Sequence, residues 1–153
     1  MRYNIFIHAD PDFEHIDHDM EKVAHATLSY LNAPDGDLTL VLTDDAGIQK
    51  LNREFVGIDR PTDVLSFING EPDPDTGRMY FGDVVLSIPS ADRQAKQSGH
   101  SLGDELNLLI THGVLHLLGF EHEEEEDRQK MWSVQDQILT QVGSKIASPR
   151  QTE

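Results

Sequence analysis

Three histidines in the C-terminal part of the chain have the spacing expected of metal ligands. His112 and His116 are four residues apart in a segment predicted to be helical, so both imidazoles project from one helix face. Gly119 is expected to end that helix and let the chain turn back, so that His122 can supply a third nitrogen. Three protein ligands leave the fourth zinc position open to water, whose pKa a bound cation lowers to about 7. The spacing therefore predicts an open metal site of the catalytic type.

The residue after the first histidine separates two chemistries. Metallopeptidase helices with this histidine spacing carry a glutamate there as the general base, whereas this chain has Gly113. Peptidase activity is therefore disfavoured. A glycine inside a helix costs about 1 kcal/mol relative to alanine, so either a ligand passes close to the backbone or the helix packs tightly there. The acidic residues at 121 and 123–127 lack the spacing of a calcium loop and predict a solvated helix start.

The other histidines carry weaker signals. His15, His18 and His25 fall on the exposed side of an earlier predicted helix and are expected to have no chemical role. His100 precedes the helix that carries the ligands, and it either lines the pocket or is an ordinary loop histidine.

The elements that must position the three ligands alternate between strands and helices. The clearest predicted helix covers residues 102–118 and contains the first two histidines. The predicted fold is α+β, with a small mixed sheet of about four strands packed with about five helices, one of them a zincin-like metal helix. Alternation of polar and apolar residues predicts strands at residues 3–8, 38–43, 64–67 and 80–88. Apolar periodicity predicts the remaining helices at residues 12–31, 44–55, 89–97 and 131–142.

Length and composition set further limits. The 153 residues suit one domain over residues 1–153, in which the polar segment 143–153 is expected to be a frayed tail. The chain has no cysteine, which excludes disulfide partners and thiolate ligands. No apolar stretch approaches the roughly 18 residues that cross a bilayer. We therefore expect a cytoplasmic protein without a membrane partner.

The net charge argues against an unaided nucleic-acid binder. The chain carries 28 acidic and 12 basic side chains, a formal charge of −16, which opposes binding to RNA. The least acidic part is residues 50–100, with six basic side chains against eight acidic ones. A bound cation, together with arginines of this part such as Arg53 and Arg60, would offset the charge beside a phosphate.

Three sequence blocks resemble a known family. Residues 112–122, HGVLHLLGFEH, resemble the signature H-G-x-L-H-L-x-G-[YF]-[DE]-H of the YbeY family of metal-dependent endoribonucleases, which are rRNA maturation factors. Residues 59–67, DRPTDVLSF, agree with a second block, and residues 82–87, GDVVLS, match the family strand G-D-I-x-I-S. The blocks keep the family's order and spacing over roughly residues 48–131.

The resemblance implies both a site and a role. It implies that His112, His116 and His122 bind one Zn²⁺ per chain, although imidazole alone would also suit nickel, copper or iron. It implies processing of the 3′ end of small-subunit ribosomal RNA and ribosome quality control, with ribosomal RNA and the small ribosomal subunit as partners. Asp63 and Ser66 of the second block are candidates for the catalytic cleft. A turn-capping acid and an ordinary strand hydroxyl are equally good interpretations of these two residues.

One position departs from the family pattern. The family usually has an arginine after the run L-N-x-x-[YF], and here Phe55 is followed by Val56, which cannot donate to a phosphate. Arg53 or Arg60 would then have to bind the substrate in its place. A smaller departure is Ile68, where a proline commonly follows the phenylalanine.

These observations lead us to expect a zinc-dependent, single-strand-selective endoribonuclease that uses a metal-bound water or the 2′-hydroxyl of the RNA. Two alternatives stay open: another metal-dependent hydrolase, or a ribosome assembly factor with a structural metal site and weak or no nuclease activity. Val56 and the charge of −16 favour the assembly factor. An open metal position would favour the enzyme.

Overall fold

The computed structural model describes residues 2–120 and 124–144. In this part of the chain it contains four strands and five α-helices, together with a 3-10 helix (η1) and a π-helical turn (η2). The α+β class, the mixed sheet and the number of elements confirm the predicted fold class. In chain order the elements are β1 (Tyr3–Ala9), η1 (Pro11–Phe13), α1 (Met20–Tyr30), β2 (Gly36–Thr43), α2 (Asp45–Leu51), η2 (Asn52–Val56), β3 (Val64–Pro72), β4 (Met79–Ser87), α3 (Ile88–Ser98), α4 (Leu102–Leu117) and α5 (Glu125–Gln141).

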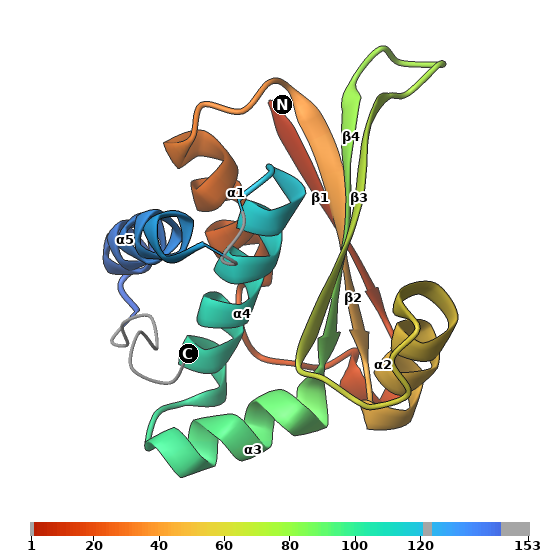
Figure 1. Ribbon diagram of the computed structural model, residues 1–153, viewed down its shortest axis with the longest axis vertical. Coiled ribbons are helices and arrows are strands. Elements are labelled where there is room, and N and C mark those ends of the chain that lie inside the picture. The colour runs from red at the N-terminus through yellow and green to blue at the C-terminus, as the bar shows by residue number, and fades with distance from the viewer. Residues whose placement is uncertain (1, 121–123, 145–153) are drawn as a thin grey trace.

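A four-stranded sheet forms one layer of the molecule (Figure 1). Its strand order is β1-β2-β4-β3, in which β1, β2 and β4 are parallel and β3 runs antiparallel to β4. Helices α1 and α4 pack against one face of the sheet, and α5 packs on these two helices. Helix α2 contacts β4 from the opposite face. The helix that carries the histidines therefore lies between the sheet and α5.

Alternation along the central strands builds the core beneath α4. In β2, Leu38, Leu40 and Leu42 share one face and are at most 1% exposed, as a side-chain period of two requires. Helix α4 contributes Leu106 and Ile110, both fully buried, to the same core. Burial of each of these side chains stabilises the fold by roughly 1.5–3 kcal/mol. The apolar stripe of α4 thus holds the helix against the sheet.

Local signals set the two ends of α4. The Ser101 hydroxyl accepts a hydrogen bond from the backbone N–H of Asp104 at 3.1 Å and caps the N-terminus. After the last helical residue the chain turns at Gly119, whose φ of +95° favours glycine. The observed ends agree with the helix predicted over residues 102–118 to within one residue. None of the described helices is both long enough and apolar enough to cross a membrane.

The helix predicted over residues 12–31 is wrong in its first half. Helix α1 begins only at Met20, because the Asp19 carboxylate accepts a hydrogen bond from the backbone N–H of Lys22 at 3.2 Å and caps the helix there. His18 therefore lies before the helix, and its Nε2 is 2.8 Å from Oδ1 of Asn107 on α4. The placement of His18 on the exposed side of that helix is therefore also wrong.

Two other elements are longer than predicted. The strand predicted at residues 64–67 continues to Pro72, because it pairs with β4 across an irregular register between Ile68 and Glu71. The last helix begins at Glu125 rather than at Met131, with three acidic residues in its first turn. Most of the predicted tail, residues 145–153, lies outside the described residues.

Gly82 permits the close pairing of β3 and β4. Its φ is +136°, and a Cβ atom added there would lie 2.1 Å from the carbonyl oxygen of Phe67. Both the backbone angle and the space at this position therefore require glycine.

We expect Gly82→Ala to lower the free energy of unfolding by roughly 3 kcal/mol or more, because it adds a clash with a backbone atom to the strain of a positive φ. Gly77→Ala is the matched control: its φ is +72°, but no atom lies within 4 Å of the added Cβ, so only about 1–2 kcal/mol is expected. Urea unfolding of both variants measures the difference. Equal losses would contradict the proposed clash.

Candidate functional site

Helix α4 places His112 and His116 one turn apart on one face. Their Nε2 atoms are 3.1 Å apart, and their ring planes are inclined by 74°. Two nitrogens that each lie about 2.0–2.1 Å from one tetrahedral ion are about 3.3 Å apart. The observed separation is within a few tenths of an ångström of that value, so the two rings fit a shared zinc ion.

A buried glutamine on α5 orients the first of these rings. His112 donates from Nδ1–H to Oε1 of Gln135 at 2.9 Å, and Gln135 is only 1% exposed. A hydrogen bond from one ring nitrogen fixes the tautomer in which the other nitrogen carries the lone pair. Gln135 therefore keeps Nε2 of His112 available beside His116. The only mark of Gln135 in the sequence is that a polar residue interrupts the buried stripe of α5 between Met131 and Ile138.

The predicted third ligand, His122, lies outside the described residues. Within residues 2–120 and 124–144, no group of three or more His, Asp or Glu side chains is arranged to hold a metal ion. The predicted turn toward His122 does begin in the described part of the chain. After Gly119, the N–H of Phe120 donates back to the carbonyl oxygen of Leu115 at 3.0 Å.

A cavity of about 190 Å³ opens beside His112. Asp63, one of the candidates from the sequence, lies in its wall, and Oδ2 of Asp63 accepts a hydrogen bond from Nε2 of Gln94 at 3.1 Å. The structure therefore brings Asp63 and His112 to one cavity. Its lining mixes polar and apolar side chains: Asp63, Val64, Gln94, Glu105, Leu108, Leu109, His112, Trp132 and Gln135.

A buried pair of an acid and a histidine adjoins the same cavity. Nε2 of His100 is 2.6 Å from Oε1 of Glu105, and the two side chains are 15% and 4% exposed. Burial raises the pKa of Glu105, and the hydrogen bond from His100 acts in the opposite direction. Glu105 lies two helical turns before His112 on α4 and lines the cavity, whereas His100 contacts Glu105 from the loop before the helix. The sequence pattern alone does not distinguish Glu105 from a solvated acid in the first turn of a helix.

Ser66 and Gly113 hold β3 and α4 close together beside the histidines. The Ser66 hydroxyl donates to the carbonyl oxygen of Gly113 at 3.0 Å. A Cβ atom added to Gly113 would lie 2.6 Å from Cγ1 of Val84 and 3.2 Å from Oγ of Ser66. Tight helix packing therefore accounts for the glycine, and the Ser66 hydroxyl contacts the backbone of the helix that carries His112 and His116.

The two arginine candidates lie in different places. Arg53 is in η2, which continues α2 on the sheet face opposite α4, and its Nη1 is 3.6 Å from Oδ1 of Asp59. Arg60 is exposed and lies in the loop that leads to Asp63; its carbonyl oxygen accepts a hydrogen bond from Nδ2 of Asn52 at 2.9 Å. The structure therefore places Arg60, but not Arg53, on the segment that leads to the cavity.

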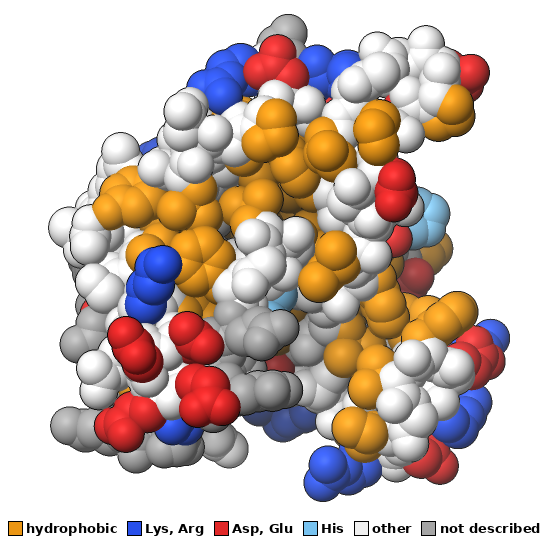
Figure 2. Space-filling model, turned by 45° about the horizontal axis from the view of Figure 1, so that its top comes forward, with side chains coloured by type: hydrophobic (Ala, Val, Ile, Leu, Met, Phe, Trp, Pro, Cys, Tyr) orange, Lys and Arg blue, Asp and Glu red, His pale blue; other side chains and the backbone are white. Residues whose placement is uncertain are grey.

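Val56, at the position where the family pattern has an arginine, also lies on the sheet face opposite α4. Val56 ends η2 and is 50% exposed, and the neighbouring Phe55 is 68% exposed with its ring edge against Phe67. Exposed hydrophobic side chains are not confined to this segment, as one face of the molecule shows (Figure 2).

Comparison with known proteins identifies the family of this chain. The family model described as endoribonuclease YbeY matches residues 7–143. The chain belongs to the YbeY family. A YbeY endoribonuclease of Heliobacterium modesticaldum is 41% identical over 136 residues, which cover 81% of each chain. One from Persephonella marina is 39% identical over 134 residues, covering 87% of this chain and 88% of that protein. The resemblance found in the three sequence blocks is thereby confirmed.

A solved structure shares the fold. The solution structure of TM1509 from Thermotoga maritima superposes with a TM-score of 0.59 and covers 95% of this chain and 98% of its own. The two sequences are 23% identical, so this likeness bears on the fold alone. It supports the α+β arrangement in which this member of the YbeY family holds His112 and His116.

We expect Gly113→Ala to lower the free energy of unfolding by roughly 1–3 kcal/mol, although alanine is the better helix former, because α4 must move away from the sheet. In a Val84→Ala background the same change should cost at least about 1 kcal/mol less, since the nearest atom is gone. Denaturant unfolding of the four proteins of this cycle measures the coupling. Additive losses would show that contact with Val84 does not require the glycine.

Proposed function

We propose that this chain is a zinc-dependent, single-strand-selective endoribonuclease that acts in 3′-end maturation of small-subunit ribosomal RNA and in ribosome quality control. The observation that carries the proposal is the pair of Nε2 atoms of His112 and His116, 3.1 Å apart beside a cavity that contains the Asp63 carboxylate. Membership of the YbeY family supports it, because the relatives are named endoribonucleases. Ribosomal RNA and the small ribosomal subunit would be the partners, and the cytoplasm the place of action.

The roles of the residues follow from their positions. His112 and His116, with His122 as the third ligand that the family signature implies, would hold the zinc ion. Bound zinc would polarise a phosphoryl oxygen and activate water for attack. Gln135 holds the Nδ1 proton of His112 and prevents the ring from turning. Asp63 lines the cavity, with Oδ2 held by Gln94 and Oδ1 by the Thr62 hydroxyl, and its carboxylate can accept a hydrogen bond from the RNA.

The size and lining of the cavity support a preference for single strands. A volume of about 190 Å³ has room for a single unstacked base but not for a stacked base pair. Leu108, Leu109 and Trp132 supply an apolar wall of the kind that an unstacked base contacts. Bases of a single strand leave their stack at a lower cost than paired bases, which must also break their pairing.

A second candidate function rests on the residues at the positions where phosphate-binding side chains are expected. Val56 stands where the family pattern has an arginine, Arg53 pairs with Asp59 across the sheet from the histidines, and the chain carries a charge of −16. These observations favour a ribosome assembly factor with a structural metal site and weak or no nuclease activity. The two functions differ in whether the chain alone cuts RNA.

The deciding experiment compares zinc-loaded wild type with identically purified His116→Ala on an end-labelled single-stranded RNA. We expect the wild type to cut the RNA and the variant to be at least about 100-fold slower, because one of the ligands is lost. Chelation of the metal should abolish cleavage, and the same RNA annealed to its complement should resist it.

Equal cleavage by the two proteins would identify a contaminating nuclease. No cleavage by either protein, with intact zinc binding, would overturn the nuclease proposal in favour of the assembly factor. If the duplex were cut as fast as the single strand, only the proposed selectivity for single strands would be contradicted.

Gln135→Leu should weaken zinc binding by about 10–100-fold, because Nδ1 of His112 loses the acceptor that fixes its ring. Gln129→Leu, an exposed change on the same helix, is the matched control and should bind zinc as wild type does. Competition with a chromophoric chelator measures both affinities. Unchanged affinity in a folded Gln135→Leu protein would show that the hydrogen bond does not orient a ligand.

A further inference from the structure

Strand β1 is an open edge of the sheet. It stands at the end of the strand order and pairs with β2 alone, in an unbroken register from Tyr3 opposite Gly36 to Ala9 opposite Leu42. Natural edge strands are commonly protected by lysine, proline or a bulge. The seven residues of β1, YNIFIHA, contain neither lysine nor proline, and the strand has no bulge. It is therefore a ready template for another strand.

The backbone of β1 has a defined outward side. The carbonyl oxygen of Arg2 accepts from the N–H of Gly36, and the N–H of Asp10 donates to the carbonyl oxygen of Leu42, both at 2.9 Å. Residues with even numbers thus turn their backbone groups toward β2. In a parallel pair the intervening residues point the other way, so Ile5 and Ile7 direct N–H and C=O to the outside. The described sheet has no strand on that side.

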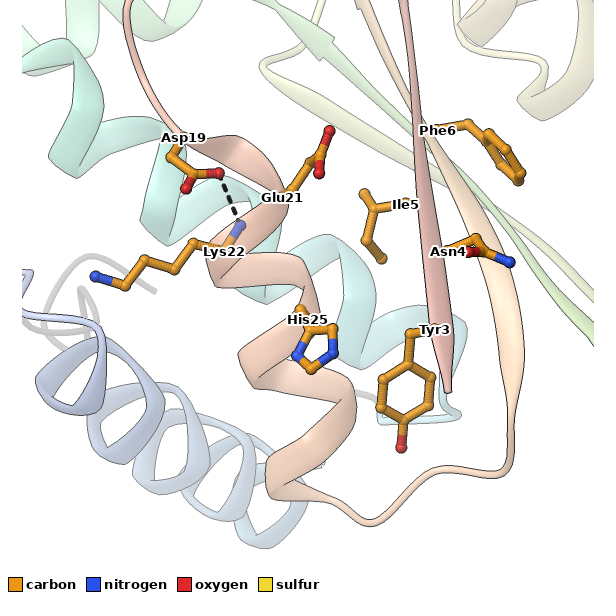
Figure 3. Close-up of a pocket in the computed structure, with 8 residues that line it drawn as sticks. All are labelled: Tyr3, Asn4, Ile5, Phe6, Asp19, Glu21, Lys22 and His25. Carbon is orange, nitrogen blue, oxygen red and sulfur yellow. Dashed lines mark hydrogen bonds between the residues drawn. The ribbon is translucent and has the colours of Figure 1, made fainter. Parts of the chain in front are cut away.

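A groove of about 370 Å³ runs between this edge and α1 (Figure 3). Tyr3 and Ile5 point toward α1 and form an apolar floor, whereas Phe6 points away to the other face of the sheet. At the rim the Glu21 carboxylate points toward β1 and the His25 ring lies against Tyr3. Asp19 caps α1, and the Lys22 side chain extends away from the strand. The groove therefore combines outward backbone groups, an apolar floor and the Glu21 carboxylate at its rim.

The negative charge of residues 1–49 indicates which kind of strand the edge would bind. Residues 1–49 hold ten acidic side chains and two basic ones, so a second copy of the chain would bring two strongly acidic regions together. An extended basic segment would be attracted instead. On an added strand every second side chain would face the groove. There the alkyl stem of a lysine or arginine could lie on Ile5 while its charge reaches Glu21.

We propose that the β1 edge binds an extended, basic segment of a protein partner by strand addition, with lysine or arginine at alternate positions directed into the groove beside α1. Side chains at the intervening positions of the added strand would meet Phe6, which is 54% exposed on the opposite face. This surface lies apart from the cavity beside His112 and shares none of its lining residues. It therefore adds a binding site for protein to the proposed nuclease site.

The test uses a fluorescent nine-residue peptide of alternating lysine and valine with blocked ends, titrated into the full chain at physiological salt. Ile7→Pro should weaken binding at least about tenfold, because it removes an outward N–H and spares the bonds to β2. Glu21→Lys should weaken it at least about fivefold by reversing the charge at the rim. Glu71→Lys, the same reversal on the opposite edge strand β3, should leave binding unchanged.

Further controls separate strand addition from general attraction. A peptide N-methylated at every residue keeps its charge but loses its donors, and it should not bind. Thermal unfolding establishes that Ile7→Pro is folded, and Glu21→Lys tests the site without a backbone change. Equal weakening by Glu21→Lys and Glu71→Lys, binding of the methylated peptide, or no binding to the wild type would overturn the proposal. A wild-type dimer that Ile7→Pro converts to a monomer would identify a second copy as the occupant and overturn it too.

Discussion

The close approach of α4 to the sheet at Gly113 is the contact on which the rest of the structure depends. Val84 and Ser66 occupy the space that any side chain at this position would need, so the helix lies at a fixed height above β3 and β4. Buried residues such as Ile110 hold its rotation about its own axis. Once height and rotation are fixed, the directions of His112 and His116 follow. Packing in the apolar core thus determines the geometry of a polar pair.

Polar contacts between elements fix the orientations of side chains whose positions the packing of the core determines. Buried hydrogen-bonding groups need partners, and near this cavity the partners come from separate parts of the chain. Gln135 reaches His112 from α5, and His100 reaches Glu105 from the loop before α4. A low local dielectric strengthens such contacts and makes their loss costly. The side chains around the cavity are therefore held in one arrangement by the same rule that governs the interior of any protein.

The features that the sequence predicted well are those with local signals. The period of α4, its glycine stop and the spacing of His112 and His116 depend on neighbours a few residues away, and the structure has all three. The partnership of His112 with Gln135 and the position of Arg53 across the sheet depend on how distant elements pack, which periodicity does not encode. His18 shows the same limit, because its contact with Asn107 joins the segment before α1 to α4.

The place of Gln135 in the chain has a consequence for biosynthesis. A ribosome makes α4 before α5, so a growing chain holds both histidines of the pair before it holds the residue that orients the first of them. Until α5 leaves the exit tunnel and docks, His112 lacks the Gln135 acceptor that orients its ring. The arrangement beside the cavity is thus completed only after α5 has been made and has docked on α4.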